Sequence, residues 1–372
     1  MVALLTELAA LESPTDNPRA TARALDRLAD ELAASGMAVR RVPGQISAGT
    51  IVARPGSRVR RRPVQMLVGH CDTVWPVGTT ALMPVLVAEG QIRGPGVFDM
   101  KGGLVQLIFA LRALRHVRCD LPATPVVVIT SDEEVGSPES RRTTVRFARH
   151  AVRAFVLEPA YGSAGKLKTS RKAVGEFEVV IKGRAAHAGL SPGEGTSAIL
   201  ELSHQIQRLF ALNDPSRGIS VNVGTIDGGV RPNVIAPEVR ALVDVRVPTM
   251  ADADRIETAI RGLTPVDDRS SIQISGSFGH PPLEPLPRNR ALWTLARSLA
   301  ATIGIDLEEA AVGGASDGNV ISQYTATLDG LGAVGDGAHA AHEYVLASKL
   351  SERAALVALL LSAPIGAAGA HP

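Results

Sequence analysis

Short apolar segments that lead to acidic or imidazole side chains recur along this 372-residue chain, and they constrain its fold more than any other feature. Segments 63–69, 125–130 and 154–158 are short and rich in aliphatic or β-branched residues, which favours strands over helices. His70 directly follows the first segment, and Glu158 ends the third. Because the apolar runs are nearly continuous, we expect strands that are buried on both faces of a sheet.

A helix is predicted between the first two of these strands. Segment 102–118 repeats its leucines and Ile108 at helical spacing, so one face of this helix packs against other elements. The alternation of strands and helices is typical of an α/β fold with a mainly parallel sheet and helices on both faces. In such sheets ligands gather outside the carboxyl ends of the strands, which is where the acidic and imidazole residues occur.

The pattern changes between residues 173 and 280. There the segments predict the order strand, helix, strand, strand, helix, strand, which is that of a ferredoxin-like split βαβ unit. Segment 175–183, for example, alternates apolar and polar residues, as a strand with one buried face does. We therefore expect an α+β domain at 173–280, inserted into a discontinuous domain formed by 1–172 and 281–372.

Composition narrows the class of protein. The chain is 45% hydrophobic and 20% charged, which indicates a globular protein, and its length favours two domains. Its 39 basic and 37 acidic side chains nearly cancel, so we expect no nucleic-acid or membrane-surface partner. Segment 1–13 has helical spacing without a basic flank, and no apolar run reaches membrane-spanning length. These features predict a cytoplasmic protein with no membrane partner.

Two histidines and several carboxylates form the candidate functional set. They are His70, Asp72, Asp99, Glu133, Glu134, Glu158 and His339. Zinc and similar divalent ions take imidazole nitrogen and carboxylate oxygen in this mixture, and the set is large enough for two hydrolytic ions and a free glutamate base. Cys71 lies between two members of the set, but a strand would point it to the opposite face, so we expect a buried core thiol.

Individual members of the set have competing interpretations. Asp72 stands two residues after His70, hence on the same side, where its carboxylate can accept the second ring N–H of a metal-bound imidazole. Asp99, in the glycine-rich segment 94–103, can bridge two metal ions. The alternative for Asp99 is the N-cap of the helix at 102–118.

Three consecutive acids follow the strand at 125–130. On an exposed loop Asp132, Glu133 and Glu134 would form a solvated acidic face. At a metal site they would have two tasks, since one carboxylate binds the ion while its neighbour takes a proton from the attacking water. A glutamate suits the second task because a metal ion lowers the pKa of water towards about 7.

An ordered series of motifs resembles the M20 metallopeptidase family, with glutamate carboxypeptidase-like members most similar. The motifs are HCDTV (70–74), GPGVFDMKGG (94–103), TSDEEVGS (130–137), LEPA (157–160), AAHAG (185–189), GGVRPNVIA (228–236), GGASDGN (313–319) and GDGAHAAHEYV (335–345). The resemblance spans nearly the whole chain, and its relatives include acetylornithine deacetylase and succinyl-diaminopimelate desuccinylase. It implies an α/β zinc-exopeptidase-like domain and a lid that also serves as a homodimer surface.

The resemblance also implies a role for each member of the set. Asp99 would bridge two zinc ions, for which cobalt or manganese can substitute, and the peptide bond after it would be cis. His70 and Glu158 would complete one metal site. Glu134 and His339 would complete the other, with His339 preferred over His342 because the family's ligand stands four residues before a glutamate, here Glu343. Glu133 would be the general base, and Asp72 would orient His70.

For the inserted domain the resemblance implies substrate contacts. His187 would stabilise the oxyanion, whereas without the family context it would be a hydrogen-bonded turn histidine. Asn233 and Arg246 would hold the carboxyl end of the substrate, although Arg246 could instead pair with a nearby acid such as Asp244. Gly314 would let the substrate approach the backbone.

One position departs from the family pattern. Glutamate carboxypeptidase-like members usually carry an arginine in the hinge after the lid, and His280 stands at the corresponding place here. An imidazole cannot grip a carboxylate through two parallel bonds as a guanidinium does. The hydrolytic set is unaffected, but release of a C-terminal glutamate is not predicted.

Together these inferences predict a di-zinc hydrolase. It would cleave an amide next to a free carboxylate in a small molecule or short peptide, as a carboxypeptidase or an N-acyl amino acid amidohydrolase does. One alternative is a deacylase of a biosynthetic intermediate such as acetylornithine or succinyl-diaminopimelate. A more distant alternative is a metal- or peptide-binding scaffold without catalysis, since folds can persist after activity is lost.

Overall fold

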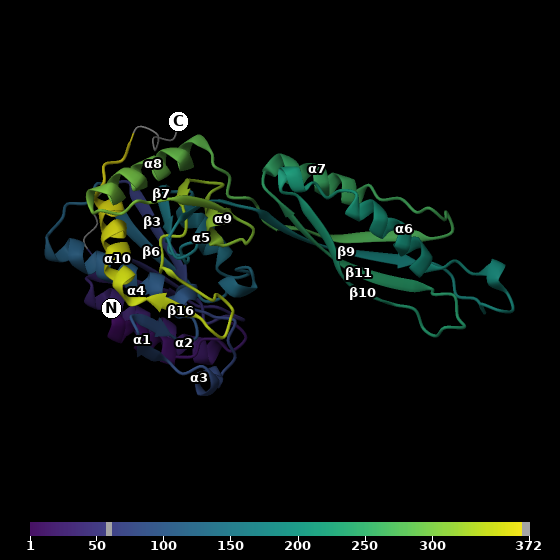
Figure 1. The fold of residues 1–372 in the computed structure, drawn as a ribbon, viewed down its shortest axis with the longest axis horizontal. Helices are drawn as coiled ribbons and strands as arrows, with labels where there is room; N and C mark the ends of the chain where they lie inside the picture. Colours follow the sequence, from purple (N-terminus) through teal and green to yellow (C-terminus); the bar gives the residue numbers. More distant parts are fainter. Residues whose placement is uncertain (57–61, 367–372) are drawn as a thin grey trace. The chain divides into compact units, whose positions relative to one another are not determined.

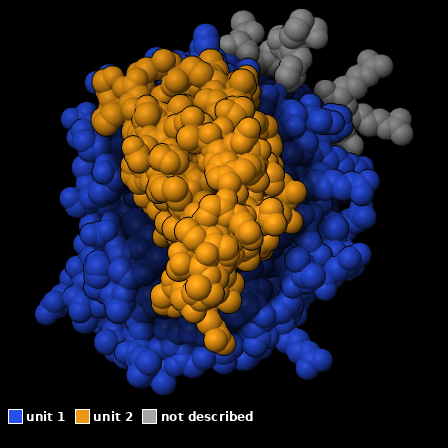
Figure 2. All heavy atoms as spheres, turned by 90° about the vertical axis from the view of Figure 1, so that its right-hand side faces the viewer, with its two compact units in different colours: residues 1–170, 284–312, 316–372 blue, residues 171–283, 313–315 orange. Residues whose placement is uncertain are grey.

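The protein is described by a computed structural model that covers residues 1–56 and 62–366. The described chain divides into two compact units, coloured separately in Figure 2. Unit 1 comprises Met1–Ser170, Glu284–Val312 and Ser316–Pro372, and unit 2 comprises Arg171–Leu283 and Gly313–Ala315. Assignment of Gly313–Ala315 to unit 2 was not indicated by the sequence.

Unit 1 is built on a six-stranded sheet (Figure 1). In order across the sheet, its strands are β1 (Met37–Val42), β2 (Thr50–Pro55), β6 (Thr124–Thr130), β3 (Val64–His70), β7 (Ala151–Val156) and β14 (Ala326–Leu328). The last four run parallel, and β1 and β2 are antiparallel additions at one edge. The predicted mainly parallel sheet is therefore confirmed.

Helices cover both faces of this sheet, as expected from the continuous apolar runs. Leu67 of β3 belongs to the larger core, while its neighbours Met66 and Val68 belong to the core on the opposite face. The larger core is shared by α1 (Val2–Ala10), α2 (Pro18–Ala34), α4 (Gly102–His116), α8 (Pro287–Thr302) and α10 (Ala347–Ser362). The opposite core includes side chains of α5 (Arg141–Ala148) and α9 (Asp317–Ile321).

Shorter elements bring distant segments of unit 1 together. A second sheet joins β15 (Gly335–Asp336), β16 (Tyr344–Leu346), β5 (Gln91–Arg93) and β4 (Leu86–Ala88), and β8 (Leu167–Arg171) pairs with β13 (Glu309–Val312). A short helix, α3, spans Thr79–Leu82. Because β16 pairs with β5, the loop that precedes β16 is carried close to the segment that follows β5. Over the described residues, no helix is both long and apolar enough to cross a bilayer.

Unit 2 has a four-stranded antiparallel sheet. Its order is β10 (Ser220–Gly228), β11 (Glu238–Val247), β9 (Ala173–Lys182) and β12 (Ser271–His280), and the helices α6 (Ala198–Phe210) and α7 (Met250–Arg261) interrupt the strands along the chain. The chain order β9-α6-β10-β11-α7-β12 is the predicted split βαβ order. Phe177, Val179 and Ile181 of β9 point into one core with apolar residues of both helices.

Candidate metal centre

His70 is the last residue of β3, and its imidazole is buried at the carboxyl end of the parallel sheet. Its Nδ1 atom lies 3.0 Å from the backbone oxygen of Asp72 and 3.5 Å from Oδ1 of the same residue. A proton on Nδ1 can be donated to that backbone oxygen, which leaves the Nε2 lone pair free for a metal ion. Nε2 points instead to the carboxylates described below.

Asp72 is fully buried and is held in place by two donors. The Thr15 hydroxyl donates to Oδ2 of Asp72 over 2.8 Å, and the backbone N–H of Glu134 donates to the same atom over 3.2 Å. The structure thus brings Asp72 to the same side as His70, as the spacing predicted. The predicted acceptor differs, because the backbone oxygen of Asp72 faces Nδ1 at hydrogen-bond distance, whereas Oδ1 of its carboxylate has no hydrogen-bond partner among the described residues. The contact with Thr15 comes from the N-terminal segment and has no signal in the sequence.

Asp99 lies in a turn that joins β5 to α4. The turn Val97–Lys101 has π-helical hydrogen bonding, and the Asp99–Met100 peptide bond is cis, which confirms that expectation. Helix α4 has Lys101 at its N-cap and no side-chain cap hydrogen bond. The alternative interpretation of Asp99 as the helix cap is therefore wrong, and its carboxylate is available for another purpose.

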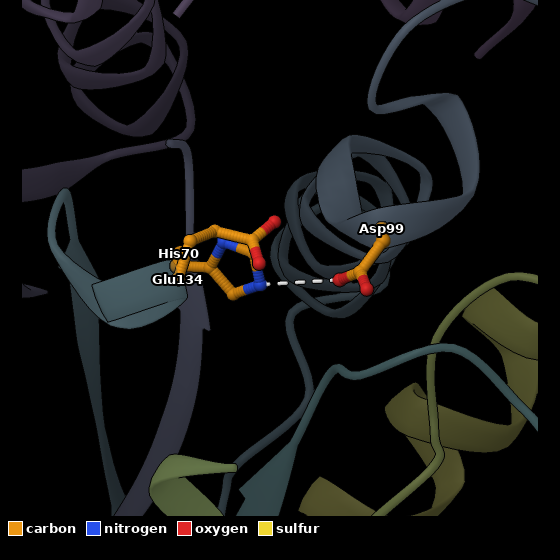
Figure 3. A group of neighbouring side chains, drawn as sticks. All are labelled: His70, Asp99 and Glu134. Carbon is orange, nitrogen blue, oxygen red and sulfur yellow. Dashed lines mark hydrogen bonds and ion pairs between the residues drawn. The ribbon is translucent and has the colours of Figure 1, made fainter. Parts of the chain in front are cut away.

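The Asp99 carboxylate lies between two histidines. Its Oδ1 atom is 3.2 Å from Nε2 of His70, and its Oδ2 atom is 3.5 Å from Nε2 of His339. Figure 3 shows the first of these contacts, with the carboxylate of Glu134 on the His70 side. One oxygen facing each imidazole is the arrangement that a carboxylate needs to bridge two cations a few ångström apart.

The three acids after β6 are divided by a tight turn. Asp132 is buried, and its Oδ2 atom accepts hydrogen bonds from the backbone N–H groups of Glu139 and Ser140. Glu133 and Glu134 begin a short 3₁₀ turn, and their side chains are 14% and 6% exposed. The alternative of a solvated acidic face is therefore wrong.

Two further carboxylates approach His70. Oε1 of Glu158 lies 3.4 Å from Nε2 of His70, and Oε2 of Glu133 lies 4.0 Å from it. The sequence predicted that a strand would end at Glu158, but β7 ends at Val156. The chain continues alongside β3 because the Leu157 N–H donates to the Val68 oxygen over 2.9 Å, and this delivers Glu158 to the same edge.

His339 reaches the group from the loop before β16. Its Nε2 atom lies 3.1 Å from Oε2 of Glu134, and its side chain is 51% exposed. The backbone of His339 has a φ of 60°, in the left-handed region that non-glycine residues seldom adopt. His342, the alternative ligand, is exposed on the same loop.

The combined donor set fits divalent cations. Ligand atoms lie within 4.8 Å of one another in two groups, His70 with Asp99 and Glu134, and His70 with Glu133 and Glu158. Oε2 of Glu133 lies 4.0 Å from Nε2 of His70, farther away than the nearest oxygens of Asp99 at 3.2 Å and of Glu158 at 3.4 Å, so we prefer Asp99 as the partner of Glu158. Oε1 of Glu134 is buried and has no hydrogen-bond partner among the described residues, and such an orphaned oxygen is suited to a cation.

Burial and close contacts within the site shift the pKa values of three of its side chains. Contacts with Asp99 and Glu134 raise the pKa of His339 to about 10. Burial acts to lower the pKa of His70, but the neighbouring carboxylates outweigh it and raise this pKa well above the usual range. Burial also raises the pKa of Glu133 far above its ordinary value. A glutamate whose pKa is raised in this way holds a proton more readily, as a general base requires.

The predicted substrate contacts of unit 2 fall in several places. His187 is exposed, and its Nδ1 atom accepts hydrogen bonds from the backbone N–H groups of Gly189 and Leu190. The proton of a neutral His187 ring is therefore on Nε2, which is left as a donor. The next residue, Ala188, donates its N–H to the Asn233 oxygen over 3.0 Å, so the His187 and Asn233 segments are adjacent.

The remaining three residues occupy other parts of the unit. Arg246 lies on β11 and pairs with Asp244, with Nη2 and Oδ2 2.9 Å apart, so the structure contains the ion pair that the alternative interpretation named. His280 is the last residue of β12. The Gly314 oxygen accepts a hydrogen bond from Nη1 of Arg171 over 3.1 Å.

Comparison with known proteins identifies related chains. The sequence profile of peptidase family M20/M25/M40 matches residues 66–363. Carboxypeptidase G2 from Pseudomonas sp. (strain RS-16) is 28% identical over 260 residues, which is 68% of this chain and 61% of that protein. Acetylornithine deacetylase from Myxococcus xanthus is 29% identical over 262 residues, 66% of each chain. The matched region thus spans less than two thirds of either relative's length.

A solved structure has the same fold. The aminopeptidase PepT from Bacillus cereus superposes with a TM-score of 0.80 and 20% sequence identity, covering 97% of both chains. At this identity the likeness establishes the fold alone. The structural likeness to PepT extends across nearly all of the chain, whereas the sequence matches to the two relatives above cover about two thirds of it.

Proposed function

This chain belongs to peptidase family M20/M25/M40, and from that membership we propose that it is a di-zinc hydrolase of amide bonds next to a free carboxylate. Its substrates would be short peptides or N-acyl amino acids. The observation that carries the proposal is the position of Asp99, with one carboxylate oxygen near His70 and the other near His339. A buried glutamate, Glu133, lies beside this arrangement.

All residues of the candidate set except Asp72 and Glu133 are proposed as metal ligands. His70 and Glu158 would hold one ion, Glu134 and His339 the other, and Asp99 both. The ions, when bound, would polarise the amide carbonyl and acidify the attacking water. Zinc is proposed because its preferred ligands are the imidazole and carboxylate groups present, and cobalt or manganese would be accepted by the same set.

The two remaining residues of the set, Glu133 and Asp72, would transfer a proton and orient a ligand, respectively. Glu133 would take a proton from the water and later give it to the leaving amine, in line with the effect of burial on its pKa. Asp72 would fix the orientation and tautomer of His70, since its backbone oxygen can accept a hydrogen bond from Nδ1–H of the ring. The Nε2–H group of His187 would donate to the oxyanion of the tetrahedral intermediate.

Specificity for a carboxylate is proposed to come from unit 2. Asn233, Arg246 and Gly314 would contact the carboxyl end of the substrate, and Arg246 would then exchange its bond with Asp244 for one to the substrate. His280 would offer a single hydrogen bond where a guanidinium would offer two. We therefore propose a substrate carboxylate without assigning a C-terminal glutamate.

Assembly and location remain predictions. We propose a homodimer formed through unit 2, which would act as a lid, and a cytoplasmic location. Both cysteines of the chain, Cys71 and Cys119, are free thiols, which is compatible with a reducing compartment. Cys71 is buried in the larger core, as predicted, and burial raises the pKa of its thiol to about 12.

A substrate panel with paired variants would test the function. Purified protein loaded with zinc or cobalt should release amines from N-acyl amino acids or dipeptides with a free carboxylate. Glu133→Gln should retain two ions and lose turnover by roughly a hundredfold or more, whereas Glu134→Gln should lose an ion. Two bound ions without turnover on a broad panel would instead favour the scaffold, and wild-type activity in Glu133→Gln would remove the proposed base.

A further inference from the structure

A carboxylate outside the proposed ligand set links the loops of the site. Glu343 is 1% exposed, and both of its oxygens are fully engaged. Oε1 accepts hydrogen bonds from the backbone N–H groups of Phe98 over 2.8 Å and of Asp99 over 3.0 Å. Oε2 accepts from the Gly96 N–H over 2.9 Å and from Nε1 of Trp75 over 2.9 Å.

These donors belong to the segments that deliver three proposed ligands. Trp75 is on the loop that follows His70, and the backbone donors lead directly to Asp99. Glu343 itself is on the loop of His339, where its N–H donates to the Ala340 oxygen over 2.9 Å. One side chain therefore touches all three loops, although they are far apart in the sequence.

The chemistry of these contacts requires a carboxylate. Hydrogen bonds to an ionised acceptor are roughly twice as strong as neutral ones, and each Glu343 oxygen accepts two. A glutamine of the same shape has only one acceptor oxygen, and its amide would place a donor against two donors. At least one backbone N–H of the Asp99 turn, or the Trp75 indole, would then be buried without a partner.

We propose that Glu343 is a positioning residue that fixes the Asp99 carboxylate between His70 and His339, and so sets the affinity of the centre for its second ion. The proposal rests on the metal centre proposed above. Glu343 does not touch substrate or ions in this account, and it acts through the turn Val97–Lys101. Residues that orient ligands in this way commonly change metal affinity by 10- to 100-fold when they are replaced.

Glu343→Gln tests the proposal through metal binding rather than activity. We expect the weaker of the two zinc affinities, measured by competition with a chromophoric chelator, to fall by about 10- to 100-fold. The matched control is Glu201→Gln in unit 2, where another buried carboxylate accepts from the backbone N–H groups of Val266 and Asp267. That control should lower the Tm of the metal-free protein and leave both zinc affinities within about twofold.

A milder variant covers the case in which Glu343→Gln does not fold. Trp75→Phe removes one of the four donors and should weaken the same zinc affinity by about fivefold, the value of one ordinary hydrogen bond. Wild-type zinc affinities in either folded variant, with only a lower Tm, would reduce Glu343 to a structural role and overturn the proposal. Failure of the wild-type protein to bind two ions would contradict the proposed function instead, so the two failures are distinguishable.

Discussion

Nε2 of His339 lies 3.1 Å from Oε2 of Glu134, although unit 2 is inserted between these two residues in the sequence. Glu134 stands on the turn after β6, and His339 stands on the loop before β16. Both residues converge on Asp99, since Oδ2 of Asp99 lies 3.5 Å from the same imidazole nitrogen. The proposed second ion site is thus formed only in the folded unit.

Exchanging one histidine of this loop at a time tests the ligand assignment. His339→Ala should bind one zinc ion per chain instead of two, because an imidazole ligand of the second site is lost. His342→Ala is the matched control from the same exposed loop and should bind two. Zinc content after dialysis, measured by atomic emission, distinguishes them, and the reverse pattern would transfer the assignment to His342.

Removing the hydroxyl of Thr15 tests how Asp72 is held. Thr15→Val keeps the shape of the side chain but deletes the donor to Oδ2 of Asp72. We expect zinc affinity to fall by roughly tenfold, because an Asp72 side chain that is held less firmly would also displace the Asp72 backbone oxygen that faces Nδ1 of His70. Thr15→Ser keeps the hydroxyl and should behave as wild type. Equal zinc affinities in the valine and serine variants would show that this contact does not support the centre.

Replacing His187 tests the assignment of an oxyanion donor. His187→Ala should lower kcat by roughly 100- to 1,000-fold while two zinc ions stay bound, because the donor acts on the transition state and not on the metal. His204→Ala, another histidine of unit 2, is the control and should leave kcat unchanged. An effect of His187→Ala on KM alone would place this residue in substrate binding.

Acid pH should remove one contribution to stability. Burial acts to raise the pKa of Glu139, but donors from Ser47, Ile46 and Gln45 outweigh it and lower this pKa to about 2. The folded-state pKa lies below the unfolded value of 4.5, so the stabilisation is complete above about pH 4.5 and disappears between there and about pH 2.

Glu139→Gln should therefore have a lower Tm than wild type at pH 7, corresponding to about 1 kcal/mol in the free energy of unfolding. The difference in Tm should shrink as the pH is lowered to 3. A difference that stayed constant between pH 7 and pH 3 would mean that the charge of Glu139 is not responsible. Metal-free protein should be used, so that loss of ions at low pH does not contribute.

Much of the fold followed from local pattern. The continuous apolar runs at β3 and β6 and the alternation in β9 were enough to predict these strands. A strand buried on both faces is apolar throughout, whereas a strand buried on one face alternates apolar and polar residues. The end of β7 was misplaced because Leu157 extends the apolar run although it no longer belongs to the strand. An apolar run indicates which residues are buried, and buried residues can continue beyond the last hydrogen bond of the strand. The end of the run is therefore a poor guide to the end of the strand.

The candidate site was less accessible to sequence reasoning. The interpretation of Asp99 as a helix cap could be rejected only when α4 was seen to begin without it. Glu343 served in the sequence only to mark the position of His339. Its contact with Trp75, and the contact of the Thr15 hydroxyl with Asp72, have no signal in the sequence, since only the tertiary fold brings these partners together. The pairing of Arg246 with Asp244 was foreseen as an alternative, because two residues on one face of a strand are neighbours.

The central claim is that Asp99 bridges two cations, and anomalous scattering from a crystal of the zinc-loaded protein would test it most directly. Data collected at the zinc absorption edge should contain two peaks about 3.5–4 Å apart, each within bonding distance of a different oxygen of Asp99. His70 should contact one peak and His339 the other. A single peak, or two peaks that Asp99 does not join, would contradict the account.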